Sequence, residues 1–342
     1  MLYRRAMLFN PSCRNRASSH CFAWFDRGRR IARRLAFRYA LHSIIGLLFL
    51  ALFLRQIDLG GVIAIARQVW VAPLVIALLA YAMDFLLRAV RFWMVLESVS
   101  GRRLPFRRVP GPFVASFGIS DLLPLRAGDV FRLLWFQRQM ALPASGVLGA
   151  MMVERFLDLA TLLLLAVAVA GWHLDGHWLF YLALLAGGCI ATPMLTAAAG
   201  RWARRSRTMR WAWIRGLVSA LDTFRILRSP GLAVSVTGLS LAAWLLEAAV
   251  LLGAWISLGG AAEAWAAPMA AFVTSTLGTL FPGLPGHFGT FELFGLEMFA
   301  RVGVAPDFAA AVLLLAHLML WAPTALFAIG WLPFSRSRQA AH

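Results

Sequence analysis

The chain alternates long apolar runs with short polar stretches that hold most of its arginines. About six of these runs approach the roughly 20 residues that an α-helix needs to cross a bilayer. They cover approximately residues 36–54, 70–90, 151–170, 178–198, 231–258 and 307–331. Runs of this length and composition predict an all-α, polytopic membrane protein with about six transmembrane helices.

Two further apolar pieces, about 111–125 and about 266–300, are too short or too broken to span, and "PGLPGHFG" interrupts the second. Of the 33 arginines, 27 lie in the N-terminal and C-terminal tails and in a few polar stretches. Arginines gather on the cytoplasmic side of membrane proteins, and these segments all lie on one side of the membrane only if each broken piece returns to the side from which it came. Both pieces are therefore predicted to be re-entrant hairpins. The first enters from the cytoplasm and the second from outside, with both termini cytoplasmic.

Two broken elements that enter from opposite faces are typical of inverted-repeat transporters with a site near the membrane midplane. Non-helical backbone at that depth is tolerated where protein or a wet cavity surrounds it. The alternative is that the pieces only fill gaps in a bundle, and plain sequence identity reveals no repeat. The predicted organisation is a basic N-terminal tail over 1–35 that is cytoplasmic or lies at the membrane interface, one integral-membrane domain over 36–331, and a cytoplasmic C-terminal tail over 332–342.

Composition supports the membrane class and argues against several others. Hydrophobic residues make up 61% of the 342, charged residues 14%, and mean hydropathy is +0.74. The net charge of +18 does not predict a nucleic-acid partner, because the arginines lie in loops between apolar runs. Three cysteines (Cys13, Cys21, Cys189) form no paired motif, so no metal site or cofactor is predicted. Soluble-enzyme and nucleotide-binding motifs are also missing, which argues against an enzyme.

The first cluster of ionisable residues lies in "LPLRAGDVFRLLW". Arg126, Asp129 and Arg132 are spaced so that a helix would place them in one ladder, with Asp129 able to pair with either arginine. Pro124 and Gly128 indicate a break followed by a new helix. One interpretation is that Arg126 and Arg132 bind an anionic lipid headgroup. The other is an internal salt-bridge ladder that fixes a helical hairpin.

The second cluster lies at the start of the run over 151–170. Glu154 and Asp158 share one helix face, and Arg155 is one step aside. The carboxylates could be counter-charges for the arginines or a proton-titrating pair. They could equally belong to a purely structural network.

The third feature is the break in "FPGLPGHFGTFE". Prolines and glycines end any helix there and make this segment a candidate gate. The gating residues are Pro282, Pro285, Gly286 and Gly289. Glu292 follows in the first turn of the next helix, where it could cap that helix or line the outer half of a pathway. His287 could titrate or could simply bond to backbone.

Five other ionisable residues fall within apolar runs or at their ends. Asp84 and Arg88 are predicted to form a structural pair, and Arg91 is predicted to extend toward the cytoplasmic interface. Glu247 is the most isolated carboxylate and needs a partner or a proton, so it is a further site candidate. His317 in the last run is a secondary candidate.

Three sequence blocks, in order, resemble the lysylphosphatidylglycerol synthase transmembrane region, or flippase-like, family: "LLPLRAGDVFRLL", "VERFLDLATLLLL" and "FPGLPGHFGTFE". Together they anchor most of 80–331. The family's Arg–Gly–acid–Arg, Glu–Arg–Asp and Pro–Gly blocks transfer onto this chain, except that His287 stands where many members have a second glycine. The corresponding residues are Arg126, Gly128, Asp129, Arg132, Glu154, Arg155, Asp158, Pro285, Gly286, Gly289 and Glu292.

The resemblance implies a bacterial inner-membrane protein that moves a lipid, or a lipid-linked intermediate, between leaflets. The aminoacyl-transfer domain of the namesake proteins is not expected here, and one branch of stand-alone relatives is associated with hopanoid biosynthesis. The expected partners are a membrane lipid as substrate and enzymes of lipid biosynthesis. The alternatives are a membrane-embedded lipid or polyprenyl transferase, and a non-catalytic scaffold for a lipid-synthesis complex.

Overall fold

A computed structural model describes residues 40–123, 126–171, 187–188 and 222–340 of the chain, and all regular structure in those ranges is helical. The predicted all-α fold is thus confirmed. The α-helices run, in chain order, over Ala40–Leu54, α3 (Leu59–Ala66), α4 (Val71–Ser100), α5 (Pro110–Leu122), α6 (Ala127–Gln139), α7 (Ala144–Gly171), α10 (Pro230–Ser257), α11 (Ala266–Gly278), α12 (Thr290–Arg301) and α13 (Pro306–Ala340). Short 3₁₀ turns are η2 (Phe106–Arg108), η3 (Asp222–Arg228), η4 (Ala262–Ala264) and η5 (Pro285–His287).

Three helices of the described part, α4, α10 and the Pro306–Pro333 stretch of α13, are long and apolar enough to cross a membrane. The helix over Ala40–Leu54 and α3 meet at 79° and could form a fourth, bent span. Helix α7 has 28 residues but includes three charged ones between Glu154 and Asp158. The run predicted at 178–198 lies outside the described residues except for 187–188, so the count of six spans stays a prediction.

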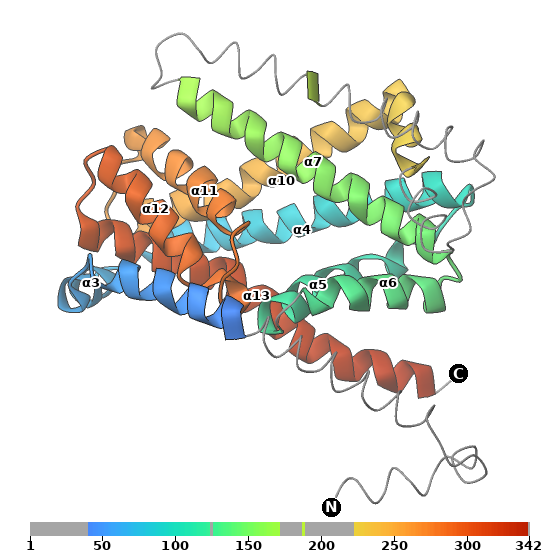
Figure 1. Ribbon diagram of the computed structural model, residues 1–342, viewed down its shortest axis with the longest axis horizontal. Helices are drawn as coiled ribbons and strands as arrows, with labels where there is room; N and C mark the ends of the chain where they lie inside the picture. The colour runs from blue at the N-terminus through green and yellow to red at the C-terminus, as the bar shows by residue number, and fades with distance from the viewer. Residues whose placement is uncertain (1–39, 124–125, 172–186, 189–221, 341–342) are drawn as a thin grey trace, which may run out of the picture.

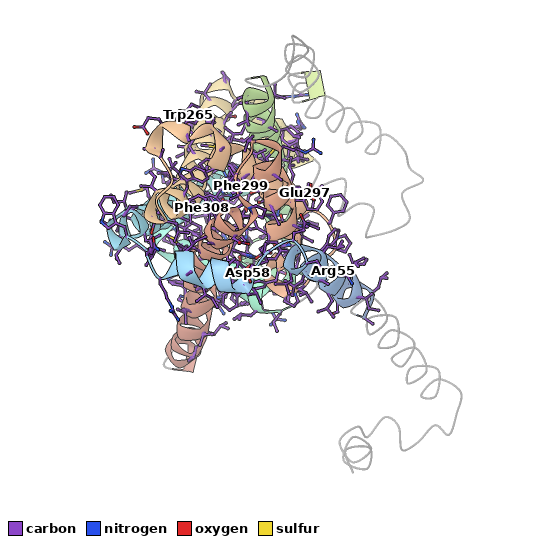
Figure 2. All side chains as sticks on the ribbon, turned by 90° about the vertical axis from the view of Figure 1, so that its left-hand side faces the viewer. Arg55, Asp58, Trp265, Glu297, Phe299 and Phe308 are labelled. Carbon is purple, nitrogen blue, oxygen red and sulfur yellow. The ribbon has the colours of Figure 1, made fainter. Side chains whose placement is uncertain are left out.

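Both broken pieces form hairpins of two short helices. Helices α5 and α6 flank the break after Leu122, so the first hairpin extends beyond the predicted 111–125, to Gln139. Helices α11 and α12 flank the break between Gly278 and Thr290. The two hairpins extend toward each other from opposite ends of the bundle (Figure 1). Figure 2 shows the bundle from the end at which the second hairpin begins. Trp265, the residue before α11, is labelled there.

The order of helices repeats. Helices α4, α5, α6 and α7 have 30, 13, 13 and 28 residues, and helices α10, α11, α12 and α13 have 28, 13, 12 and 35. Each set is therefore long, short, short and long. The second set runs in the opposite direction to the first along the bundle (Figure 1). This arrangement agrees with the inverted repeat predicted from the two breaks.

Helices α4 and α10 pack against each other along the middle of the bundle. Their backbones approach closely at Gly253, where an added Cβ would lie 2.6 Å from the Ala77 Cβ atom. Small residues at such a crossing are typical of helix packing in membranes. The outward faces are apolar, with Ile76 68% and Val234 74% exposed, as expected for a lipid-facing surface.

The apolar core is divided into two main clusters. One contains residues of α10, α11, α12 and α13, such as Phe272 and Leu313. The other contains residues of α4, α5, α6 and α7, such as Phe92 and Phe136. Each cluster is thus centred on one set of four helices, and α7 and α10 also contribute to the cluster of the other set through Leu162, Leu165 and Val236.

The start of α3 offers a local test of helix capping. The Asp58 carboxylate accepts hydrogen bonds from the Gly60 and Gly61 amides at 3.1 and 3.0 Å. We expect Asp58→Ala to cost about 1 kcal/mol of unfolding free energy because these amides lose their acceptor. Thermal unfolding in detergent measures the change. Asp58→Asn, which keeps an acceptor oxygen, should cost less, and equal losses in both variants would contradict the capping role.

Candidate functional site

A cavity of about 860 Å³ lies where the two hairpin tips meet. The first tip contributes Leu123 and Arg126, and the second contributes the segment from Thr279 to His287. The helix over Ala40–Leu54, the long helices α4, α7, α10 and α13, and the hairpin helices themselves supply the remaining walls. The ionisable residues of the wall are His42, Asp84, Arg88, Asp121, Arg126, Asp129, Arg132, Arg155, Asp158, Glu247, His287 and His317. A largely apolar protein therefore gathers most of the interior charges of its described part around one cavity.

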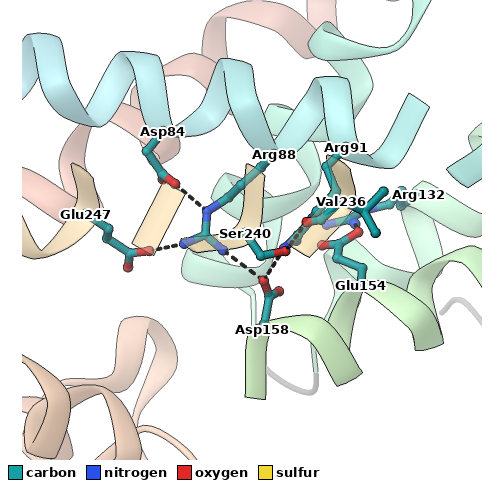
Figure 3. A network of polar contacts seen from close by, with 9 residues as sticks. All are labelled: Asp84, Arg88, Arg91, Arg132, Glu154, Asp158, Val236, Ser240 and Glu247. Carbon is teal, nitrogen blue, oxygen red and sulfur yellow. Dashed lines mark hydrogen bonds and ion pairs between the residues drawn. The ribbon is translucent and has the colours of Figure 1, made fainter. Parts of the chain in front are cut away.

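Arg88 of α4 is the hub of the largest network of charges (Figure 3). Its Nε atom donates to Asp84 at 2.6 Å, one turn away on the same helix. Its two terminal nitrogens reach Glu247 of α10 and, at 3.4 Å, Asp158 of α7. Glu247, which is isolated in the sequence, thus has a partner from another helix, and the predicted Asp84–Arg88 pair is confirmed.

Arg91 extends the same network instead of leaving the protein interior. Its Nη1 atom lies 2.7 Å from an Asp158 carboxylate oxygen and 2.7 Å from the Ser240 hydroxyl (Figure 3). The residue is only 1% exposed. The prediction that Arg91 extends to the cytoplasmic interface is wrong, because Asp158 and Ser240 hold its Nη1 atom inside the bundle, where Nε and Nη2 have no hydrogen-bond partner among the described residues.

Arg132 of α6 is the centre of a second network. Its Nη1 atom lies 2.7 Å from Glu154 of α7, and its Nε atom donates to the Ser116 hydroxyl of α5 at 2.9 Å. Its guanidinium also lies over three rings, with centroid distances of 5.3, 4.5 and 4.8 Å, those of Phe92, Phe113 and Phe117. These contacts join the first hairpin to α7 and leave the guanidinium 1% exposed.

The expected ladder of Arg126, Asp129 and Arg132 does not form. Helix α6 begins at Ala127, so Arg126 precedes the helix and has a left-handed backbone with φ of 53°. Asp129 pairs instead with Arg155 of α7 at 3.1 Å. The charges of the two blocks therefore meet across helices. Arg126 is exposed to the cavity, in contrast to the buried Arg132.

The second tip is bound to α13 through Glu292 and His317. One Glu292 oxygen accepts the Gly289 amide at 2.8 Å, which confirms the predicted position of this carboxylate at the start of a helix. The other oxygen contacts His317 Nδ1, and His317 Nε2 lies 2.7 Å from the Gly286 carbonyl.

Asp121 of α5 is a cavity residue that the sequence patterns did not single out. Its carboxylate accepts a hydrogen bond of 2.7 Å from the Thr324 hydroxyl of α13. Tyr81 of α4 likewise donates to the Leu320 carbonyl of α13 at 2.6 Å. A signal for Asp121 was present in the sequence, because it is a carboxylate within an apolar piece and two residues before the break.

No group of three or more His, Cys, Asp or Glu side chains in the described ranges is arranged to hold a metal ion. The ionisable residues instead pair acid with base across helices, as in the Arg88 and Arg132 networks. The chemistry that such a wall offers is recognition of charged and hydrogen-bonding groups inside an apolar protein.

The fold and the cavity define a polytopic α-helical membrane protein with a charged interior site between two opposed hairpins. The family model of the lysylphosphatidylglycerol synthase TM region matches residues 39–328, and the chain belongs to this family. No curated protein matches the chain. Membership supports a membrane location and a lipid-related function.

Proposed function

We propose that this protein moves a lipid, or a lipid-linked intermediate, between the leaflets of the bacterial inner membrane. The observation that carries the proposal is the cavity lined by both hairpin tips and by charged side chains. A polar headgroup needs such a path to cross the apolar interior, whereas the tails can stay in the bilayer. The proposed topology keeps both termini in the cytoplasm.

Arg126 and Arg155 are the arginines best placed to meet a phosphate group. Arg126 is exposed at the cavity wall, and the Arg155 side chain is 43% exposed even though it pairs with Asp129. A guanidinium binds phosphate through two parallel hydrogen bonds. Arg132 would act indirectly, by fixing the first hairpin through Glu154. In this proposal Asp129, Asp158 and Glu247 balance the positive charges of the cavity wall. Glu292 and the break over 282–289 form the gate on the side of the second hairpin.

The proposal is tested with the purified protein in vesicles that contain fluorescent anionic, zwitterionic or neutral lipids. We expect the wild type to expose inner-leaflet label to an external quencher, and Arg126→Gln to lower that rate about tenfold or more, the usual effect of losing a charged hydrogen bond to a ligand. Arg103→Gln removes an exposed arginine that is not part of the cavity wall, so it should transport normally. Absence of transport by the wild type with every lipid would contradict the proposal.

A conservative change at Asp158 separates a positioned site from a scaffold. Asp158 contacts Arg91 at 2.7 Å and Arg88 at 3.4 Å through one oxygen, so the longer side chain of Asp158→Glu must move both contacts. We expect a folded protein whose transport rate falls about tenfold or more, because misplacement by about 1 Å impairs a positioned site. A scaffold would tolerate the change, and wild-type transport by this variant would remove Asp158 from the proposed site.

A further inference from the structure

His317 faces two groups that accept hydrogen bonds. Its Nε2 atom lies 2.7 Å from the Gly286 carbonyl oxygen, which can only accept, so Nε2 must carry a hydrogen. Its Nδ1 atom contacts a Glu292 carboxyl oxygen, and the other oxygen of that carboxyl already accepts the Gly289 amide at 2.8 Å. The Nδ1–oxygen contact therefore needs one proton, held either by the ring as an imidazolium or by the carboxyl as an acid.

Because the pair is buried, the presence of this proton decides whether its hydrogen bonds can all form. The His317 and Glu292 side chains are 6% and 1% exposed. If the proton leaves, a lone pair on Nδ1 faces a lone pair on the carboxylate. If the ring then shifts its remaining hydrogen to Nδ1, it loses the Gly286 carbonyl instead. Either way one of the buried hydrogen bonds is lost.

The bonds in question hold the tip of the second hairpin. Gly286 and His287 have φ of 71° and 63°, and His287 is one of only three non-glycine residues with positive φ in the described part of the chain. A non-glycine residue persists in that conformation only when its surroundings impose it. The His317 ring itself stacks on Phe288, with centroids 4.5 Å apart, and lies 4.8 Å from Phe291. Contacts with α13 therefore impose the shape of this tip.

The tip of the second hairpin is also packed closely against its neighbours. If it separates from α13, the shape of the cavity must change. A Cβ atom at Gly286 would lie 2.8 Å from the Trp321 ring, and one at Gly289 would lie 2.7 Å from the Leu50 backbone nitrogen. The segment from Thr279 to His287 lines the cavity together with His317. Movement of this segment would widen or close the path between the two tips.

We infer that His317 and Glu292 form a proton-binding site whose occupancy fastens the tip of the second hairpin to α13. Loss of the proton to the cavity releases Gly286 or Glu292 and frees the tip to move. This inference rests on the proposed function only for its consequence, which is that the proton becomes the coupling ion for lipid movement. A proton-titrating pair was one sequence interpretation of Glu154 and Asp158, the others being counter-charges and a structural network, and each of the two carboxylates is paired with an arginine.

Other ionisable groups surround the pair. Asp121 of α5 interacts electrostatically with His317, and so does His287 of η5. Arg126, at the tip of the first hairpin, and Arg155 of α7 act on His287. His42 of the first helix and Glu247 of α10 line the same cavity. A test must therefore separate the pair from these neighbours.

Glu292→Gln provides that separation. The glutamine carbonyl can accept the Gly289 amide, and its NH₂ group can donate to Nδ1 of a neutral His317 that still donates to Gly286. All three bonds then form without the extra proton, so the tip should stay fastened at every pH. Glu297→Gln is the matched control, because it makes the same change at an exposed position of the same helix.

The measurement is amide hydrogen exchange of residues 281–290 in the full-length protein from about pH 5 to about pH 9, a range that spans histidine titration. Rates are corrected for the intrinsic pH dependence of exchange. We expect protection in the wild type and in Glu297→Gln to fall about tenfold as pH rises, the effect of losing one buried hydrogen bond. In Glu292→Gln the protection should stay high throughout.

Constant protection in the wild type, or equal pH dependence in Glu292→Gln and the wild type, would overturn the proton site. Loss of the pH dependence in Glu297→Gln would overturn its assignment to Glu292. If Glu292→Gln does not fold, the wild-type profile still decides. A titrating tip in a protein that moves no lipid would overturn the proposed function and leave the proton site standing.

Discussion

Replacement of Arg88 by methionine is expected to destabilise the protein by about 3–5 kcal/mol, the usual cost of leaving buried charges without their partner. The side chain is 6% exposed and contacts three carboxylates from three helices, those of Asp84, Asp158 and Glu247. Methionine fills similar volume and removes the positive charge, so the loss reports electrostatics more than packing. Thermal unfolding in detergent, followed by circular dichroism, measures the change.

Two companion variants make the Arg88 result interpretable. Arg67→Met removes an exposed arginine at the end of α3 and should change stability by less than about 0.5 kcal/mol. Adding Glu247→Gln to Arg88→Met removes one uncompensated carboxylate and should restore part of the loss. An Arg88→Met protein as stable as the wild type would show that the three carboxylates do not depend on this cation.

Replacement of Gly128 by alanine is expected to separate the two helices of the first hairpin. An added Cβ would lie 1.7 Å from the Ser116 carbonyl oxygen and 2.5 Å from the Ser120 hydroxyl. The nearer clash is with backbone, so α6 must move as a whole and with it the Arg132–Glu154 pair. We expect a loss of about 3 kcal/mol, at the upper end of the usual cost of overpacking.

Gly238→Ala is the matched control for the Gly128 variant. Gly238 lies on an exposed face of α10, and an added Cβ would meet nothing within 4 Å. Alanine favours helix there, so stability should stay the same or rise by up to about 1 kcal/mol. Equal unfolding temperatures for Gly128→Ala and the wild type would show that the hairpin is not packed as tightly as its geometry requires.

Much of the fold was predictable, because membrane helices and their breaks leave strong local signals. The apolar runs at 70–90 and 231–258 correspond to α4 and α10, although α4 continues to Ser100 through charged residues that interrupt the run. The segment "FPGLPGHFG" predicted the break between α11 and α12 through its prolines and glycines. The inverted repeat was predictable only from the two opposed breaks. Two sets of helices can have the same order and similar lengths without having similar residues, so a comparison of the two halves of the sequence does not reveal the repeat.

Less of the site was predictable, because ion pairs between helices depend on rotation and depth. The spacing allowed Asp129 to pair with an arginine of its own segment, yet it pairs with Arg155 of α7. Arg91 was expected to reach the membrane interface. Its partners Asp158 and Ser240 come from other helices inside the bundle, and the local sequence does not reveal them. The partner of Glu247 is Arg88, 159 residues away in sequence, and no local spacing indicates such a pair.

The most direct test of lipid passage between the tips is transport with the tips tethered. Cysteines at Leu123 and Leu284, which line the cavity from opposite tips, would be joined by a cleavable bis-maleimide after Cys13, Cys21 and Cys189 are changed to serine. Each single-cysteine variant treated in the same way is the control. We predict that tethering lowers lipid translocation in vesicles to the protein-free rate and that cleavage restores it. Undiminished translocation by the fully tethered protein would contradict passage between the tips.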